Sequence, residues 1–218
     1  MIEKLVKGIH SFQTGYFAKH QGLFEELSTE GQRPEALFVT CSDSRVVPSL
    51  ITNSAPGDLF IVRNIGNVIP SPDLPGGTAA ALQYAVEVLE VQNIIVCGHT
   101  QCGAIAALLN PENMEKLQYV RKWLAQAADL RTVIEGRYGH LAPEAKLTAA
   151  VEENVLVQLE HLRAYPFVSE RLEAGKLRLM GWVFELATGK VFNYDPHQDE
   201  FTVLADPDDP DGGGAKPR

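Results

Sequence analysis

The chain has 218 residues, and 45% of them are hydrophobic. This length and composition fit one sizeable α/β domain, which buries a core without disulfide bonds. The formal net charge of −9 argues against nucleic acid and anionic membranes as partners. The three cysteines, Cys41, Cys97 and Cys102, are too few and odd in number for a disulfide framework. We therefore expect a cytoplasmic protein whose thiols stay free to act as ligands or nucleophiles.

The first 30 residues predict a helical arm. Residues 2–27 carry apolar side chains at steps of three and four residues, which is typical of an amphipathic helix. Gly22 is expected to break this helix before a second, short one. The apolar stripe packs either on its own domain or on a partner subunit. Its members are Ile2, Leu5, Val6, Ile9, Phe12, Tyr16 and Phe17.

Three continuous apolar runs predict the central strands. They cover residues 36–41, 59–62 and 93–97, and such runs are typical of parallel strands buried on both faces. A helical pattern over residues 77–89 separates the second run from the third, as in a βαβ unit. The predicted fold class is therefore α/β, with a mostly parallel central sheet flanked by helices.

The second half of the chain predicts two more helices and a hairpin. The helices are expected over residues 114–131 and 143–162, with Pro143 in a first turn. Two apolar runs between residues 177 and 194 surround Thr188-Gly189 and predict a hairpin at the sheet edge. We expect the α/β domain to span residues 31–205. The tail over residues 206–218, rich in Asp, Pro and Gly, is expected to be disordered.

Two polar segments directly follow predicted strands. One contains Cys41, Asp43 and Arg45, and the other contains His99 and Cys102. Sites in open α/β sheets form where loops leave the carboxyl ends of strands, so both segments point to one edge. Two thiolates and an imidazole suit zinc, and three protein ligands leave its fourth position open, as in catalytic sites. The sequence therefore predicts a metal site.

Neighbouring residues have both simpler and more specific interpretations. Cys97 continues an apolar strand and is interpreted as a small buried hydrophobe. Asp43 and Arg45 could form a surface ion pair of little consequence. At a metal site, Arg45 would instead hold Asp43 by charge-assisted hydrogen bonds. An ionised carboxylate only accepts hydrogen bonds, so Asp43 would orient a reacting hydroxyl.

The two motifs together resemble a known family. Cys41-Ser-Asp-Ser-Arg45, followed by Gly98-His-Thr-Gln-Cys-Gly103, is similar to the signature of the β-class carbonic anhydrases. Residues 56–67 and 181–184 resemble further blocks of that family, and the similarity runs from about residue 2 to residue 195. Bacterial and cyanobacterial members look most similar, with an active site of the plant type.

The resemblance implies a function and a set of site residues. It implies one Zn2+ per subunit on Cys41, His99 and Cys102, with Asp43 and Arg45 as the catalytic dyad. The enzyme would be a carbonate dehydratase, a carbon–oxygen lyase, in which a zinc-bound hydroxide attacks CO2 to give bicarbonate and a proton. The resemblance also implies a substrate pocket lined by Gln32, Phe60, Ile65, Tyr84 and Gly103.

The resemblance further implies how copies of the chain assemble. In this family the pocket is built at a dimer interface, and the N-terminal helix embraces the partner subunit. We therefore expect a homodimer or a dimer-based higher oligomer, and the arm stripe would face the partner. For Phe60, Ile65 and Tyr84, ordinary core packing is the competing interpretation. Whether the protein enters a bacterial microcompartment is not readable from these residues.

Other functions compete on the same residues. A hydrolase of COS or CS2 would use the same site with a different access route. A structural zinc scaffold is a second alternative, in which Asp43 would close the zinc shell permanently. A thioredoxin-like redox protein is excluded, because the chain has no Cys-x-x-Cys motif.

Residues around the first cysteine bear on regulation. One branch of the family is switched off by bicarbonate in a second pocket, and has Trp three residues before this cysteine and Gly one residue before it. Here those residues are Phe38 and Thr40. Phe38 has no indole N–H to donate, and Thr40 adds bulk, although Arg63 is retained. We expect an ungated enzyme in which Asp43 stays on Arg45.

Overall fold

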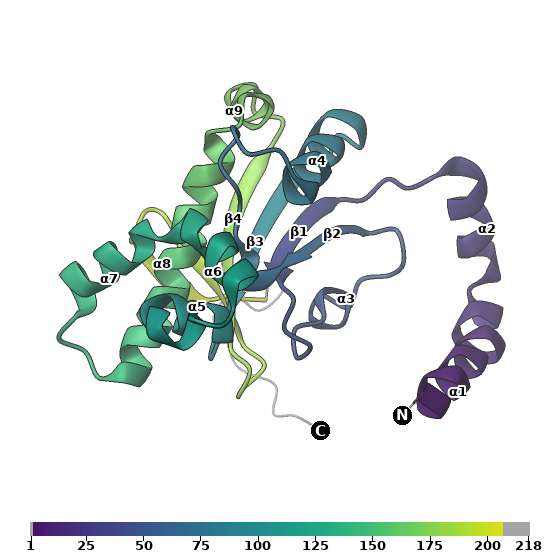
Figure 1. The fold of residues 1–218 in the computed structure, drawn as a ribbon. Coiled ribbons are helices and arrows are strands. Elements are labelled where there is room, and N and C mark those ends of the chain that lie inside the picture. Colours follow the sequence, from purple (N-terminus) through teal and green to yellow (C-terminus); the bar gives the residue numbers. More distant parts are fainter. Residues whose placement is uncertain (1, 207–218) are drawn as a thin grey trace.

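The structure is a computed structural model that describes residues 2–206, and a six-stranded sheet forms its centre (Figure 1). The strand order is β2-β1-β3-β4-β5-β6. The strands are β1 (Ala36–Cys41), β2 (Leu59–Asn64), β3 (Asn93–His99), β4 (Arg178–Phe184), β5 (Val191–Asp195) and β6 (Glu200–Val203). Strands β1 to β4 are parallel, whereas β5 and β6 are antiparallel. The predicted mostly parallel α/β sheet is confirmed, and β6 extends the predicted β4–β5 hairpin. The expected disorder of the tail falls, from residue 207 on, outside the described residues.

Nine α-helices occur in the described part of the chain, and several are shorter than predicted. They are α1 (Ile2–Phe12), α2 (Gln21–Glu30), α3 (Pro48–Ile51), α4 (Gly77–Gln83), α5 (Gly103–Leu109), α6 (Gln118–Leu124), α7 (Asp129–Tyr138), α8 (Pro143–Arg163) and α9 (Pro166–Glu173). Single π-helical turns follow α1 and α4, at Gln13–Phe17 and Tyr84–Val88. The single helix predicted over residues 114–131 is wrong, because a 3-10 turn at Ala125–Ala127 separates α6 from α7.

The predicted break in the arm is also displaced. It falls at His20 and not at Gly22, since His20 has φ −120° and ψ 25°. At this break His20 Nδ1 lies 2.8 Å from the Tyr16 carbonyl oxygen, which also accepts from the His20 backbone N–H at 3.1 Å. The His20 ring also stacks on the Tyr16 ring, with 4.1 Å between ring centroids. The side chain thus shares a carbonyl with the backbone at the end of the first helical segment.

The two faces of the sheet are covered unequally. The main hydrophobic core lies on one face, where strand residues such as Leu37, Val39 and Val96 pack against α4, α5 and α8. A second, small cluster contains the opposite side chains, including Phe38 and Cys97. Around it, Leu59, Met180, Trp182 and Phe184 are only partly buried. Helices therefore cover mainly one face of the sheet within a single chain.

Helix α8 lies very close to the sheet because two strand residues lack side chains. A Cβ on Gly98 of β3 would lie 2.9 Å from Val155 Cγ2. A Cβ on Gly181 of β4 would lie 2.9 Å from Val155 Cγ1 and 3.1 Å from Leu159 Cδ1. This close packing places α8 directly behind the carboxyl half of β3.

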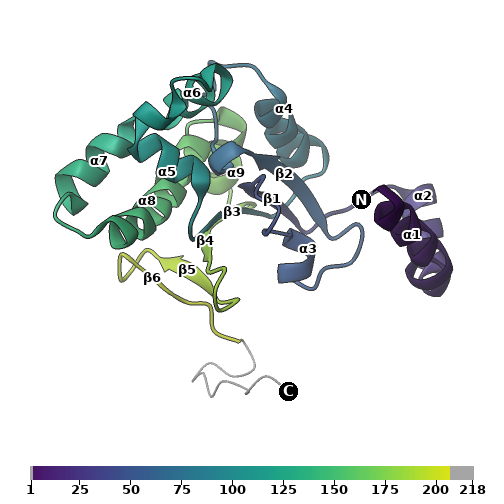
Figure 2. The same ribbon diagram turned by 60° about the horizontal axis from the view of Figure 1, so that its bottom comes forward.

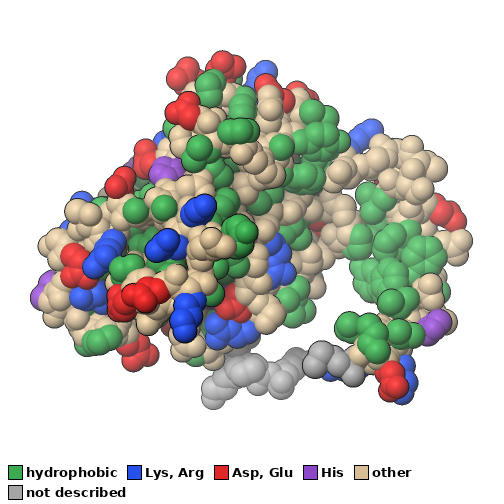
Figure 3. Space-filling view, in the orientation of Figure 1, with side chains coloured by type: hydrophobic (Ala, Val, Ile, Leu, Met, Phe, Trp, Pro, Cys, Tyr) green, Lys and Arg blue, Asp and Glu red, His purple; other side chains and the backbone are tan. Residues whose placement is uncertain are grey.

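The N-terminal arm lies apart from the sheet in both ribbon views (Figures 1 and 2). Neither α1 nor α2 contains a buried residue, and Ile2, Leu5 and Ile9 are each more than half exposed. Figure 3 shows hydrophobic side chains gathered along this arm. The stripe is thus not covered by its own domain.

None of the helices within residues 2–206 has the length and apolar character of a membrane span.

The close approach of α8 to the sheet can be tested by adding a methyl group at Gly181. Gly181→Ala should destabilise the protein by about 1–3 kcal/mol, because the added methyl group overlaps Val155 and Leu159. The measurement is equilibrium urea unfolding at fixed protein and metal concentrations. Gly136→Ala in α7 is the matched control, since a Cβ at that position would have no neighbouring atom within 4 Å. It should be stabilising by about 0.5–1 kcal/mol. A Gly181→Ala protein as stable as its parent would contradict this packing.

Candidate metal centre

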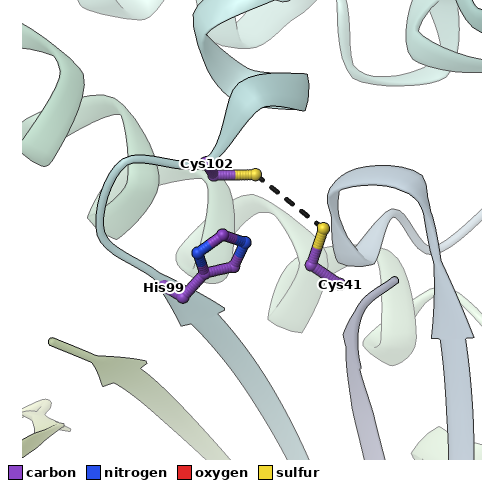
Figure 4. Close-up of side chains that lie close together, drawn as sticks. All are labelled: Cys41, His99 and Cys102. Atoms are coloured by element: carbon purple, nitrogen blue, oxygen red, sulfur yellow. Dashed lines mark hydrogen bonds between the residues drawn. The ribbon is translucent and has the colours of Figure 1, made fainter. Parts of the chain in front are cut away.

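Two strands and one helix bring three potential ligands together. Cys41 ends β1, His99 ends β3, and Cys102 directly precedes α5. Because β1 and β3 are parallel neighbours, their carboxyl ends meet at one edge of the sheet. The ligand atoms all lie within 4.8 Å of one another, and all three residues are buried (Figure 4). The three predicted metal ligands therefore form one cluster.

The His99 ring is oriented to offer one free nitrogen. Its Nδ1 lies 2.9 Å from the Thr100 carbonyl oxygen, which can only accept, so Nδ1 carries the proton. Nε2 is buried and has no hydrogen-bond partner among the described residues. A buried polar atom without a partner costs free energy, and a metal ion would satisfy it. The free nitrogen of His99 therefore supports a metal site independently of the sequence motif.

The distance between the sulfur atoms favours zinc. Cys41 Sγ and Cys102 Sγ lie 3.9 Å apart. Two thiolates at about 2.3 Å from a tetrahedral zinc ion would lie about 3.8 Å apart. Sulfur and imidazole donors also favour zinc over magnesium or calcium, which prefer oxygen.

The two thiols have opposite pKa shifts. The hydrogen bond with Cys102 is the main cause that lowers the pKa of Cys41 to about 4, and the backbone N–H of Gly66 contributes further. The same contact, with burial, raises the pKa of Cys102 well above its usual range. The protein alone therefore ionises one thiol and keeps the other protonated. A divalent cation between them would allow both to ionise, with release of a proton.

Asp43 and Arg45 form a two-pronged ion pair beside the cluster. Arg45 Nε donates to Asp43 Oδ1 at 2.9 Å, and Nη2 donates to Oδ2 at 2.8 Å. The Arg45 backbone N–H also donates to Oδ1 at 3.0 Å. These bonds hold the pKa of Asp43 well below its usual range. Asp43 Oδ2 lies 3.9 Å from His99 Nε2, so an ionised, acceptor-only carboxylate borders the ligand cluster.

Arg63 and Thr40 bond to backbone around the first cysteine. Arg63 Nη2 donates to the Asp43 carbonyl oxygen at 2.7 Å, and Nε donates to the Cys41 carbonyl oxygen at 3.3 Å. The Thr40 hydroxyl is buried and donates to the Cys97 carbonyl oxygen at 2.8 Å. These contacts fix the loop that carries Cys41 and Asp43.

Cys97 lies outside the cluster, as its apolar context predicts. Its side chain is buried on the opposite face of the sheet, with Phe38 and Ile95. Burial raises the pKa of the Cys97 thiol to about 12, so it stays protonated. A neutral, buried thiol of this kind is an inert packing residue.

The predicted pocket residues are not brought together within one chain. Ile65 directly follows β2 and is 42% exposed near the cluster edge of the sheet. Phe60 pairs in register with Leu37, about 13 Å along the strand from Cys41. The Tyr84 ring lies 6.0 Å from the Phe60 ring, and Gln32 is exposed before the amino end of β1. Gln32, Phe60 and Tyr84 therefore lie away from the chain's own ligand cluster.

Gly66 is a site residue that the sequence patterns did not single out. Its backbone N–H contributes to the lowered pKa of Cys41, and its φ of 78° lies in the left-handed region. A Cβ there would lie 3.2 Å from Ala104 Cβ. The available signal was a glycine two residues after a strand, in a block that resembles the family.

Comparisons with known proteins agree with this geometry. The family model for carbonic anhydrase matches residues 36–191. A carbonic anhydrase from Synechocystis sp. is 45% identical over 196 residues, which cover 89% of this chain and 71% of that protein. The solved β-carbonic anhydrase CcaA aligns with a TM-score of 0.91 and 43% identity, over 96% of this chain and 94% of that one. A tetrameric β-carbonic anhydrase from Sordaria macrospora aligns with a TM-score of 0.81 and 25% identity, over 88% and 95%.

The cluster predicts which cysteines hold metal. Cys41→Ser, His99→Ala and Cys102→Ser should each lose bound zinc, because each removes one of three converging donors. Each should also lower the thermal midpoint, since metal binding contributes folding free energy. Cys97→Ser is the control and should keep close to one zinc per chain. Elemental analysis of the purified proteins is the measurement. Metal retained in Cys41→Ser but lost in Cys97→Ser would refute the assignment.

Proposed function

Because the chain belongs to the β-class carbonic anhydrase family and is a carbonate dehydratase, we propose that it catalyses CO2 + H2O ⇌ HCO3⁻ + H⁺ at a zinc ion held by Cys41, His99 and Cys102. The buried Nε2 of His99 has no hydrogen-bond partner within residues 2–206 and lies beside two thiols, and this is the observation that carries the zinc assignment. Bound zinc would supply a nucleophile near neutral pH by lowering the pKa of water.

The chain's own residues then orient the reactants. Arg45 occupies both oxygens of Asp43, so the carboxylate is fixed and ionised at the edge of the cluster. Asp43 accepts a hydrogen bond from the hydroxyl of bicarbonate and so fixes the oxygen that forms or breaks its bond to carbon. Asp43 is a poor proton acceptor in this pair, because its pKa is strongly lowered. Its role is orientation, and the proton passes to solvent.

A second copy of the chain would complete the substrate pocket. Ile65 and Gly103 lie at the chain's own carboxyl-end edge, whereas Gln32, Phe60 and Tyr84 lie toward the opposite end of the sheet. These three can line a pocket only next to another copy's cluster. The uncovered apolar stripe of the arm supports the same assembly, since it would be buried against a partner. The proposed assembly is a homodimer or a dimer-based oligomer.

The cytoplasm is the compartment that we propose for the protein. All three cysteines are free, and two of them belong to the ligand cluster. A reducing compartment keeps such thiols available for metal binding.

The Asp43–Arg45 pair predicts how activity is lost. In stopped-flow assays the zinc-loaded protein should hydrate CO2, and a chelator should abolish this. Arg45→Ala should reduce the rate at least ~100-fold. The freed carboxylate would bind the nearby metal, so zinc content should remain that of the parent.

A surface ion pair provides the control for this variant. Arg137→Ala also removes the arginine partner of a carboxylate, that of Glu153, but this ion pair lies outside the ligand cluster. This variant should hydrate CO2 at the parent rate. If Arg45→Ala turned over like Arg137→Ala, Asp43 and Arg45 would not be the dyad.

The contacts of Thr40 and Arg63 predict an enzyme without bicarbonate gating. Thr40 uses its only O–H on the Cys97 carbonyl oxygen, and Arg63 is held by the carbonyl oxygens of Cys41 and Asp43, so a second anion would have to displace these bonds or rely on Arg63 alone. Near pH 7, bicarbonate should inhibit CO2 hydration only as a simple product. A crystal grown at that pH in bicarbonate should keep Asp43 on Arg45. Steep, cooperative inhibition, or bicarbonate beside Arg63 with Asp43 on the metal, would contradict this prediction.

A further inference from the structure

We propose that Asn154 and Gln158, two buried amides of α8, are positioning residues for the metal centre: they hold residues 65–70, which directly follow the end of β2 that pairs with Cys41. This inference rests on the proposed function, because it concerns how a metal ligand is aligned. Neither residue reaches the ligand cluster itself. Both act through the backbone of the segment that follows β2, which we call the 65–70 segment.

The two amides form a continuous hydrogen-bond chain to the 65–70 segment. Asn154 Nδ2 donates to the Gly66 carbonyl oxygen at 3.1 Å. Gln158 Nε2 donates to Asn154 Oδ1 at 3.0 Å, and Gln158 Oε1 accepts from the Ile69 N–H at 2.7 Å. Asn154 is 1% exposed and Gln158 is fully buried. Buried amides are costly when they are unpaired, so this chain favours one position of the segment.

The same stripe of polar side chains continues beyond Gln158. His161 Nδ1 lies 2.8 Å from the Ile69 carbonyl oxygen, and the Tyr165 hydroxyl donates to the Pro70 carbonyl oxygen at 2.9 Å. From Asn154 to His161 the steps are four and three residues, which is the spacing of one helix face, and Tyr165 follows between α8 and α9. These polar groups contact Gly66, Ile69 and Pro70 in turn.

Gly66 connects this polar stripe to the metal ligand. Its carbonyl oxygen accepts from Asn154, and two residues earlier Asn64 lies opposite Cys41 and accepts from the Ser42 N–H at 2.9 Å. The Gly66 N–H also contributes to the lowered pKa of Cys41, and groups around a ligand orient it and tune its charge donation. The preceding residue is held as well, because Trp123 Nε1 donates to the Ile65 carbonyl oxygen at 2.7 Å. Movement of the segment would thus change both the Cys41 contact and the position of Ile65.

Helix α8 also packs against the strand that carries the histidine ligand. Val151 and Val155 lie against Gly98, the residue before His99, where a Cβ would be 2.9–3.1 Å from their methyl groups. One helix therefore contacts the backbone beside His99 and, through Gly66, the environment of Cys41. Functional constellations need precision of about 0.5 Å, which such shared support can supply.

The test separates alignment of the metal from ordinary stability. Asn154→Leu keeps the branched shape of the side chain but removes both hydrogen bonds of the amide. With the zinc-loaded protein, release of zinc to a chelator should become about 10–100-fold faster. In the cobalt-substituted protein, the visible absorption bands should shift. Leu162→Ala is the matched control: Leu162 is buried in the same helix but makes no side-chain hydrogen bond to the segment. It should lower the thermal midpoint while the cobalt spectrum stays that of the parent.

A milder variant covers the case in which Asn154→Leu does not fold. Trp123→Phe keeps a smaller aromatic ring and removes the N–H on Ile65, so it should give a smaller increase in zinc release. The inference is overturned if these variants release zinc at the parent rate, or if Leu162→Ala releases it as fast and shifts the spectrum equally. A parent protein that holds no zinc would instead overturn the proposed function, and this inference with it.

Discussion

The site depends on the burial of two thiols and one imidazole nitrogen at mutual distances below 4.8 Å. The buried His99 Nε2 has no hydrogen-bond partner among the described residues, which costs free energy. A zinc ion would satisfy this nitrogen, and ionisation of both thiols would balance its charge. Asp43 lies beside the cluster with both carboxylate oxygens bonded to Arg45.

The rest of the fold supplies the rigidity that this cluster needs. Parallel strands deliver Cys41 and His99 to one edge, and α5 begins directly after Cys102. Helix α8 lies behind β3 and β4 because Gly98 and Gly181 leave room for it, and its amides bond to the segment after β2. Helix α8 supports the ligands through contacts with backbone groups. These contacts therefore place few constraints on which side chains line the exposed surface of the site.

The single chain leaves two apolar surfaces incompletely covered. One is the arm, whose α1 and α2 bury no residue, and the other is the sheet face around Trp182 and Met180. The proposed pocket residues are divided in the same way, with Ile65 at one end of the sheet and Gln32 near the other. A second copy would resolve the uncovered stripe and the divided pocket together.

Much of this protein was readable from the sequence, because local patterns carry it. Continuous apolar runs predict buried parallel strands, and the residues after them place Cys41, His99 and Cys102 at one sheet edge. The separation of Asp43 and Arg45 by two residues also predicts that they form an ion pair. The ends of the helices were harder to predict from the sequence. The break at His20 involves a contact between its ring and the Tyr16 carbonyl oxygen, and the break between α6 and α7 is a 3-10 turn.

Only the tertiary structure decided how distant segments meet. Asn154 and Gln158 look like ordinary polar residues of a long helix, and their hydrogen bonds go to backbone groups some 90 residues earlier. Gly66 likewise comes near Cys41 because β2 pairs with β1 in one register, which places Asn64 opposite Cys41. The unpartnered state of the His99 nitrogen is also a property of packing. Sequence patterns record the periodicity of one element, whereas these contacts depend on the separation and register of several elements.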